Sequence, residues 1–127
     1  MHLEHVNLTV SDLDRSVAFY CRLLGISERW RGTTSDGTHA AHIGDDHSYL
    51  ALFQSTSEGK AASPDYDGVG LNHVGFVVED LEAALQILDA EGLAAHAEYD
   101  YQPGRRAYFF DHDQIEVELV TYTAAPA

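Results

Sequence analysis

The chain has 127 residues, of which 45% are hydrophobic and 22% charged, and this composition predicts one compact domain rather than a disordered segment. Its 21 acidic residues outnumber its 7 basic ones, and a formal net charge of -14 argues against nucleic acid and anionic membranes as partners. The acidity has two readings, solubility and adaptation to high salt, where self-repulsion is screened.

The sequence shows no signal peptide, no transmembrane segment and no pair of cysteines for a disulfide. Residues 1–4 have neither the basic start nor the apolar run of a signal peptide, and no apolar stretch reaches a transmembrane length. Cys21 is the single cysteine, so no intrachain disulfide can form, which fits a reducing compartment. We therefore expect a cytoplasmic protein.

The first half of the chain predicts a strand, a helix and three further strands. Residues 3–10 alternate apolar and polar side chains, as in a strand with one solvated face. Ser11 and Asp12 are typical caps of a helix, whose apolar positions have helical spacing up to a stop at Gly25. Shorter strands are expected near 26–35, 38–44 and 48–55.

The second half repeats this plan. Residues 57–69 predict a linker between a first unit (1–56) and a second unit (70–123). The second unit is expected to begin with a strand over 70–78 and a helix that starts at Asp80 and stops at Gly92. Three strands should follow, near 94–101, 105–111 and 114–122.

An internal repeat supports this division. Leu3-Glu4-His5-Val6 matches Leu71-Asn72-His73-Val74, and at the same offset Asp12-Leu13 matches Asp80-Leu81. A βαβββ unit has one apolar sheet face that it cannot bury alone. We therefore predict an α+β fold in which 1–127 form a single domain, with the two units making a curved mixed-sheet barrel around a central site.

The repeat also predicts a metal site. His5 and His73 occupy the same place in the two units, and Glu118 lies between apolar residues in the last expected strand. Two imidazoles and one carboxylate suit Fe(II), Mn(II), Co(II), Ni(II) or Zn(II) and leave coordination positions open. The alternative is that each is an ordinary solvated or hydrogen-bonded strand residue. Most of the remaining histidines are expected at the surface: His2, His39, His42, His47, His96 and His112.

The chain resembles the vicinal oxygen chelate superfamily of glyoxalase I, fosfomycin-resistance proteins, bleomycin-resistance proteins and extradiol dioxygenases. The resemblance implies paired βαβββ units and a divalent metal bound by His5, His73 and Glu118. It spans nearly the whole chain and is carried by His5-Val6-x-Leu8-x-Val10-x-Asp12-Leu13-x-x-Ser16-x-x-Phe19-Tyr20-x-x-Leu23-Leu24-Gly25, His73-Val74-x-Phe76-x-Val78-x-Asp80-Leu81, Tyr108-Phe109-Phe110-Asp111-x-Asp113 and Val117-Glu118-Leu119.

Two departures from the family pattern matter. The usual Asp-Pro-Asp-Gly is Asp111-His112-Asp113-Gln114 here, so this turn must form without Pro and Gly, and we expect Asp113 to take a less favourable conformation. Glyoxalase I also has a glutamate ligand in the last strand of its first unit. Ala51 falls there, with Gln54 out of register, which argues against glyoxalase I chemistry.

Among the branches with three ligands, the resemblance favours an extradiol-dioxygenase-like enzyme that uses Fe(II). Tyr108 matches the active-site tyrosine of those enzymes if the turn before Glu118 preserves register, and its alternative role is to fill the barrel wall. His47 lies beside the place of their acid–base histidine, which Ser48 occupies, and is otherwise a hydrated turn residue. Tyr108 and His47 are the catalytic candidates.

Other functions stay open. In the fosfomycin branch Asn7 replaces a threonine, and the only clustered cations of the second half, Arg105 and Arg106, either bind an anionic substrate or flank an edge strand. A lyase or isomerase of the glyoxalase type would use the same metal without oxygen. A bleomycin-resistance-like protein would bind a small molecule without a metal. In each case the resemblance implies a small-molecule ligand and a homodimer.

Overall fold

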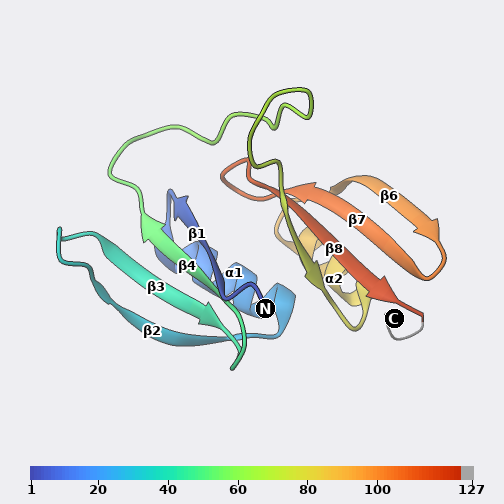
Figure 1. Cartoon of the computed structure of the whole chain (residues 1–127), viewed down its shortest axis with the longest axis horizontal. Helices are drawn as coiled ribbons and strands as arrows, with labels where there is room; N and C mark the ends of the chain where they lie inside the picture. The colour runs from blue at the N-terminus through green and yellow to red at the C-terminus, as the bar shows by residue number, and fades with distance from the viewer. Residues whose placement is uncertain (124–127) are drawn as a thin grey trace. The chain divides into compact units, whose positions relative to one another are not determined.

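The structure is a computed structural model that describes residues 1–123. The chain divides into two compact units, Met1–Gly59 and Lys60–Ala127. Each unit contains one four-stranded mixed sheet and one helix (Figure 1). The predicted α+β class and the repeated βαβββ order are confirmed.

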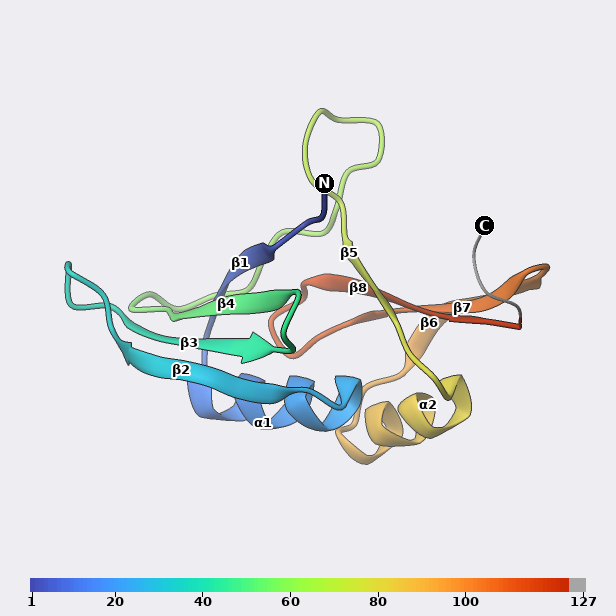
Figure 2. The ribbon, with the colours of Figure 1, turned by 60° about the horizontal axis from the view of Figure 1, so that its bottom comes forward.

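The first unit places its first and last strands side by side. The sheet order is β1-β4-β3-β2, with β1 parallel to β4 and the other neighbours antiparallel. Helix α1 packs on one face of this sheet (Figure 2). The elements are β1 (His5–Val10), α1 (Leu13–Leu24), β2 (Ser27–Thr33), β3 (His39–Gly44) and β4 (Tyr49–Gln54).

Helix α1 begins and ends at the residues that the sequence indicated. The Asp12 side chain accepts the backbone N–H of Arg15 at 3.1 Å, which satisfies one of the unpaired donors of the first turn. Gly25 ends the helix in the left-handed conformation, with φ 65°. The face between these caps is buried against the sheet through Leu13, Ser16, Val17, Phe19, Tyr20 and Leu23.

The second unit has the same topology. The sheet order is β5-β8-β7-β6, again with the first and last strands parallel, and α2 contacts β7 and β8. Asp80 caps α2 as Asp12 caps α1. The elements are β5 (Val74–Val77), α2 (Leu81–Ala90), β6 (Ala95–Tyr101), β7 (Gly104–Phe110) and β8 (Glu116–Tyr122).

Two details differ from the expectations. Each sheet is open, because the two strands at its edges (β1 and β2, β5 and β6) do not pair with each other. Neither sheet therefore closes into a barrel by itself. The strand expected over 70–78 is shorter, because pairing begins at Val74 with Val117, and His73 therefore precedes β5. The candidate ligand lies just outside the first strand of its unit, whereas His5 is the first residue of β1.

The turn that leads into β8 forms around a buried carboxylate. Asp111 is 3% exposed, and its Oδ1 accepts the backbone N–H groups of Asp113 at 2.8 Å and Ile115 at 2.9 Å. Gln114, not Asp113, takes the left-handed backbone conformation, with φ 66°, at the position where the family has glycine. The expectation for Asp113 was therefore wrong, because the Asp111 carboxylate holds the N–H of Asp113 and leaves the reversal to the next residue.

We predict that Asp111→Ala lowers the free energy of unfolding by about 1–3 kcal/mol, because it leaves one buried and one partly buried backbone N–H group without this acceptor. Asp111→Asn keeps an acceptor oxygen of the same reach and should lose less. Urea unfolding of the three proteins measures the difference. Equal stability of Asp111→Ala and wild type would contradict this account of the turn.

Candidate functional site

The candidate site of the second unit lies on one face of β7 and β8. Glu116 and Glu118 alternate along β8 and point to the same face. The antiparallel register pairs Tyr108 of β7 directly with Glu118, so the turn preserves the alignment on which the prediction for Tyr108 depended. The parallel register with β5 brings Gly75 opposite Glu118. Three strands thus converge on one carboxylate.

Glu118 lies between an imidazole and a guanidinium. Its Oε1 is 3.0 Å from Nε2 of His73, and its Oε2 accepts the Nε–H of Arg106, also at 3.0 Å. The Arg106 guanidinium lies 5.0 Å from the ring centre of Tyr101, which restricts its position. The carboxylate therefore has one oxygen bound by the arginine and the other directed to His73.

A second carboxylate, missed by the sequence analysis, lies beside the first. Glu116 is 5% exposed, and it accepts the hydroxyl of Tyr66 and a hydrogen bond from Nε2 of His96 at 2.7 Å. The hydrogen bond to Glu116, together with burial, raises the pKa of Tyr66 to about 12. The alternation of the two glutamates was visible in the sequence, but their partners were not.

Tyr108 faces both candidate ligands of this unit. Its ring meets the imidazole of His73 edge to face, with centres 5.3 Å apart, and its hydroxyl is hydrogen-bonded to Glu118. Burial, followed by that hydrogen bond and the charge of Glu118, raises the pKa of Tyr108 to about 12. At neutral pH the phenol therefore keeps its proton and is a hydrogen-bond donor.

An aromatic pocket of about 490 Å³ opens over this face. Ring faces and hydroxyl groups dominate its wall, and the carboxylate of Glu116 forms part of it. Such a wall offers stacking surfaces and hydrogen-bond partners to a small planar molecule. The lining residues are Tyr66, His73, His96, Ala97, Tyr99, Tyr101, Tyr108 and Glu116.

The third candidate ligand, His5, belongs to the first unit. Its Nδ1 is 2.8 Å from Oε1 of Glu4, and its ring stacks on that of Tyr49 with centres 4.9 Å apart. Within residues 1–123, no three His, Cys, Asp or Glu side chains gather into a metal-binding group. The structure thus brings His73 and Glu118 together, and the full triad of both units stays a prediction.

The donor atoms of His5, His73 and Glu118 nevertheless fit a divalent metal. In both histidines an oxygen atom lies within hydrogen-bond distance of Nδ1, so that Nε2 is the nitrogen left for a ligand. Nε2 of His73 and Oε1 of Glu118 are close together without an intervening side chain. A borderline cation such as Fe(II), Mn(II) or Zn(II) accepts this mixture of nitrogen and oxygen donors.

The first unit lacks the carboxylate that the second one has. Asn7 pairs with Ala51 in the first sheet as Gly75 pairs with Glu118 in the second, so Ala51 occupies the matching place, as the alignment indicated. Gln54 points elsewhere: it accepts the backbone N–H of Leu13 at 2.8 Å and so holds the start of α1. Neither residue provides the fourth ligand of glyoxalase I.

Several other histidines have defined surroundings. His47 lies in the exposed turn between β3 and β4, where its backbone N–H donates to Asp45, and its catalytic role stays a prediction. His96, expected at the surface, borders the aromatic pocket and binds Glu116. His96 is exposed, as expected, whereas His112 is partly buried and lies 3.2 Å from Glu91. His96 and His112 each lie beside a carboxylate, which their spacing in the sequence did not predict.

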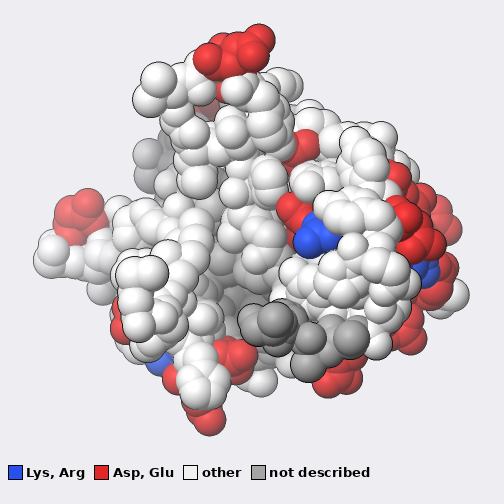
Figure 3. All heavy atoms as spheres, turned by 45° about the vertical axis from the view of Figure 1, so that its right-hand side comes forward, with Lys and Arg blue, Asp and Glu red and all other residues white. Residues whose placement is uncertain are grey.

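The two arginines of β7 differ in their partners. Arg105 pairs with Glu82 of α2 at 2.8 Å, whereas Arg106 lies on the site face and pairs with Glu118. The guanidinium groups of both are thus engaged by carboxylates. Acidic side chains are spread over the face shown in Figure 3, with few basic ones between them. Arg106 is paired through Nε, while its Nη1 is buried without a hydrogen-bond partner among residues 1–123.

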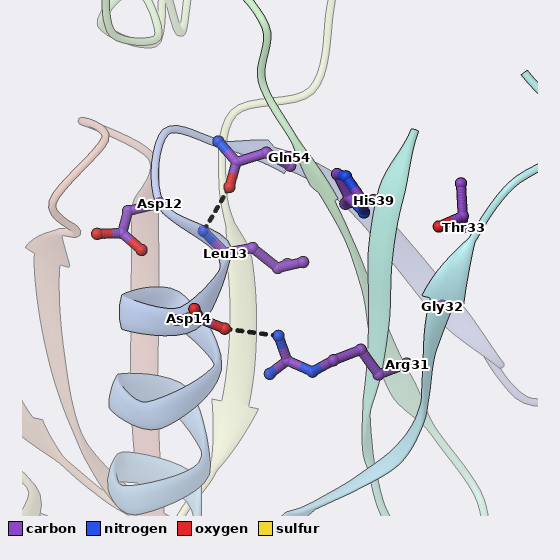
Figure 4. Close-up of a pocket in the computed structure, with 8 residues that line it drawn as sticks. All are labelled: Asp12, Leu13, Asp14, Arg31, Gly32, Thr33, His39 and Gln54. Atoms are coloured by element: carbon purple, nitrogen blue, oxygen red, sulfur yellow. Dashed lines mark hydrogen bonds and ion pairs between the residues drawn. The ribbon is translucent and has the colours of Figure 1, made fainter. Parts of the chain in front are cut away.

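A second pocket, of about 530 Å³, lies in the first unit at the start of α1 (Figure 4). Arg31 extends across it and donates to the carboxylate of Asp14, while Gln54 binds the backbone of Leu13. Its polar groups serve the helix cap and this ion pair. Although it is the larger pocket, we place the candidate chemistry in the aromatic pocket, because that one adjoins Glu118.

No helix within residues 1–123 is long and apolar enough to cross a membrane.

Comparisons with known proteins agree with this architecture. The chain is 30% identical over 122 residues to the uncharacterized protein YwkD of Bacillus subtilis (strain 168), which covers 92% of this chain and 94% of YwkD. A glyoxylase/bleomycin resistance protein/dioxygenase domain from Frankia sp. EAN1pec is 28% identical, with a TM-score of 0.77, over 96% of this chain and 92% of that one.

A more distant likeness concerns the fold alone. A variant of the fosfomycin resistance protein FosX from Listeria monocytogenes, crystallised with Mn(II) and 1S,2S-dihydroxypropylphosphonic acid, is 19% identical with a TM-score of 0.72. The match covers 98% of this chain and 93% of FosX.

The sequence profile of the Glyoxalase/Bleomycin resistance protein/Dioxygenase superfamily matches residues 2–119. This chain, with its two βαβββ units, belongs to that superfamily.

Proposed function

We propose that this protein is a metal-dependent enzyme that binds a small substrate through two vicinal oxygen atoms. Its divalent metal would be held by His5, His73 and Glu118. The observation that carries the proposal is the 3.0 Å approach of His73 Nε2 to Glu118 Oε1 beside an aromatic pocket. The FosX complex supports it in part, since the same fold there accompanies Mn(II) and a vicinal diol.

The metal would act as a Lewis acid and hold the substrate oxygens in one orientation. Arg106 keeps Oε2 of Glu118 occupied and so favours ligation through Oε1 alone. Tyr108, protonated at neutral pH, would turn its hydroxyl proton from Glu118 to a substrate oxygen on which negative charge develops. The tyrosine rings of the pocket would exclude water from the bound molecule.

The reaction that we propose is an extradiol-type oxidation, with Fe(II) as the metal and a catechol as the substrate. Two features support it. Tyr108 lies opposite Glu118 in the β7–β8 register, where the resemblance to dioxygenases requires a tyrosine. The pocket wall is rich in ring faces, and Arg105 and Arg106 of β7 each pair with a carboxylate of the chain itself. His47 enters this proposal as a proton carrier on the resemblance alone.

A second candidate is a lyase or isomerase of the glyoxalase type. The hydrogen-bonded pair of His96 and Glu116 favours it, because the pair lines the pocket and offers an imidazole for acid–base chemistry without oxygen. Ala51 argues against glyoxalase I itself, since that position bears no carboxylate.

We predict that protein purified without chelators contains about one equivalent of a divalent metal and that Glu118→Ala loses it, because only one carboxylate serves the predicted triad. Elemental analysis of both proteins measures this. Glu98→Ala removes an exposed carboxylate from β6 and is the matched control. Metal retained by Glu118→Ala would refute the ligand assignment. A wild type that takes up no Fe(II), Mn(II), Ni(II) or Zn(II) would favour a binding protein of the bleomycin-resistance type.

We also predict that the Fe(II)-loaded protein consumes oxygen when catechols are added. Tyr108→Phe should lower kcat by about 10²-fold, because it removes one hydrogen-bond donor to the charge that develops in the transition state. Its metal content should stay the same. An oxygen electrode and a parallel anaerobic assay test this. Turnover that continues without oxygen would replace the dioxygenase proposal by the lyase or isomerase.

We also propose that the protein is a homodimer, because members of the superfamily often form dimers. Light scattering of the full chain should give twice the 14.0 kDa mass of one protomer. A mass of one protomer at micromolar concentration would reject it.

A further inference from the structure

Tyr66 connects a candidate metal ligand to a buried carboxylate. Its hydroxyl lies 3.0 Å from Nδ1 of His73 and is also hydrogen-bonded to Oε1 of Glu116. The other oxygen of Glu116 binds Nε2 of His96 at 2.7 Å. Tyr66 precedes β5, in the segment that the sequence marked as a linker, so a residue outside the sheet reaches into the site.

The proton of the Tyr66 hydroxyl can serve one of these partners only. A phenol has a single proton, and a carboxylate accepts hydrogen bonds but has none to give. The proton therefore points to Glu116, and the Tyr66 oxygen is left as an acceptor. For the contact with His73 to be a hydrogen bond, Nδ1 of His73 must be the donor.

This direction decides which nitrogen of His73 can bind a metal. Nε2 faces Oε1 of Glu118, which also has no proton to give, so for this contact to be a hydrogen bond Nε2 must donate too. A metal would replace the proton on Nε2, while the proton on Nδ1 would stay with Tyr66 and leave Nε2 as the ligand. Metal-bound histidines in general donate their second N–H to an oxygen, which fixes the tautomer and the ring orientation. Nδ1 of His5 lies 2.8 Å from a carboxylate oxygen of Glu4, whereas Nδ1 of His73 reaches the carboxylate of Glu116 only through the Tyr66 hydroxyl.

We propose that Tyr66 and Glu116 are positioning residues that hold the proton of His73 on Nδ1 and so direct its Nε2 to the metal. This inference rests on the proposed function, because it needs the metal site. His96 supports the same chain by binding the second oxygen of Glu116. Glu116 is 5% exposed, and a buried carboxylate is a strong acceptor for the Tyr66 proton.

The test is the Zn(II) affinity of the full-length protein, measured by competition with a chromophoric chelator. Tyr66→Phe removes one hydroxyl and keeps the ring, and it should weaken Zn(II) binding about 10–100-fold, the usual effect of losing such an outer partner. Tyr99→Phe removes a hydroxyl from the same pocket and should leave the affinity unchanged. Thermal unfolding of each metal-free variant checks that it is folded.

Nuclear magnetic resonance supplies a signal that a merely structural role would not change. In the ¹⁵N-labelled Zn(II) protein, the Nδ1–H of His73 should appear as a slowly exchanging downfield resonance, because a hydrogen bond protects it. Tyr66→Phe, saturated with Zn(II), should lose that resonance to exchange. The Tyr66→Phe/Glu116→Ala variant should bind Zn(II) no more weakly than Glu116→Ala alone, because Tyr66 acts through Glu116.

The outcomes separate this inference from the proposed function. If His73→Ala loses Zn(II) but Tyr66→Phe binds it within twofold of wild type, the metal site stands and the positioning role is overturned. Equal losses in Tyr66→Phe and Tyr99→Phe would overturn it too, since the effect would then belong to the pocket as a whole. A wild-type protein that binds no Zn(II) would overturn both.

Discussion

The parallel pairing of β5 with β8 is the contact on which the candidate site depends. These strands are far apart in the sequence, and their register places Gly75 opposite Glu118 and leaves His73 beside the start of β8. A one-residue slip would turn both glutamates of β8 to the opposite face of the sheet, away from the aromatic pocket. The Asp111 turn sets where β8 begins, so this buried carboxylate contributes to the site without touching it.

Equal topology in the two units comes with unequal chemistry. The first strand of each unit pairs with the last, yet the place of Glu118 in the second unit belongs to Ala51 in the first. His5 instead stacks on the ring of Tyr49, whose centre also lies 4.6 Å from that of His42. The first unit therefore supplies His5 without a carboxylate at the place of Glu118, whereas the second supplies both His73 and Glu118.

Charge is balanced locally within an acidic chain. The carboxylates of the site have several partners: Glu118 has His73, Arg106 and Tyr108, and Glu116 has Tyr66 and His96. Buried carboxylates need such partners, because desolvation without hydrogen bonds is costly. The aromatic wall of the pocket is the surface on which the proposal of a planar substrate rests.

The sequence by itself determined the repeat, the helix caps and the residues of the predicted triad, because strand alternation and capping are local patterns that recur in both halves. Only the tertiary structure decided that Tyr108 faces Glu118, that Gln114 makes the reversal, and that Tyr66 and Glu116 flank His73. These contacts depend on strand register and on the path of a segment without periodicity. No local pattern encodes where such a segment meets a sheet, since that place is set by packing between residues distant in the chain.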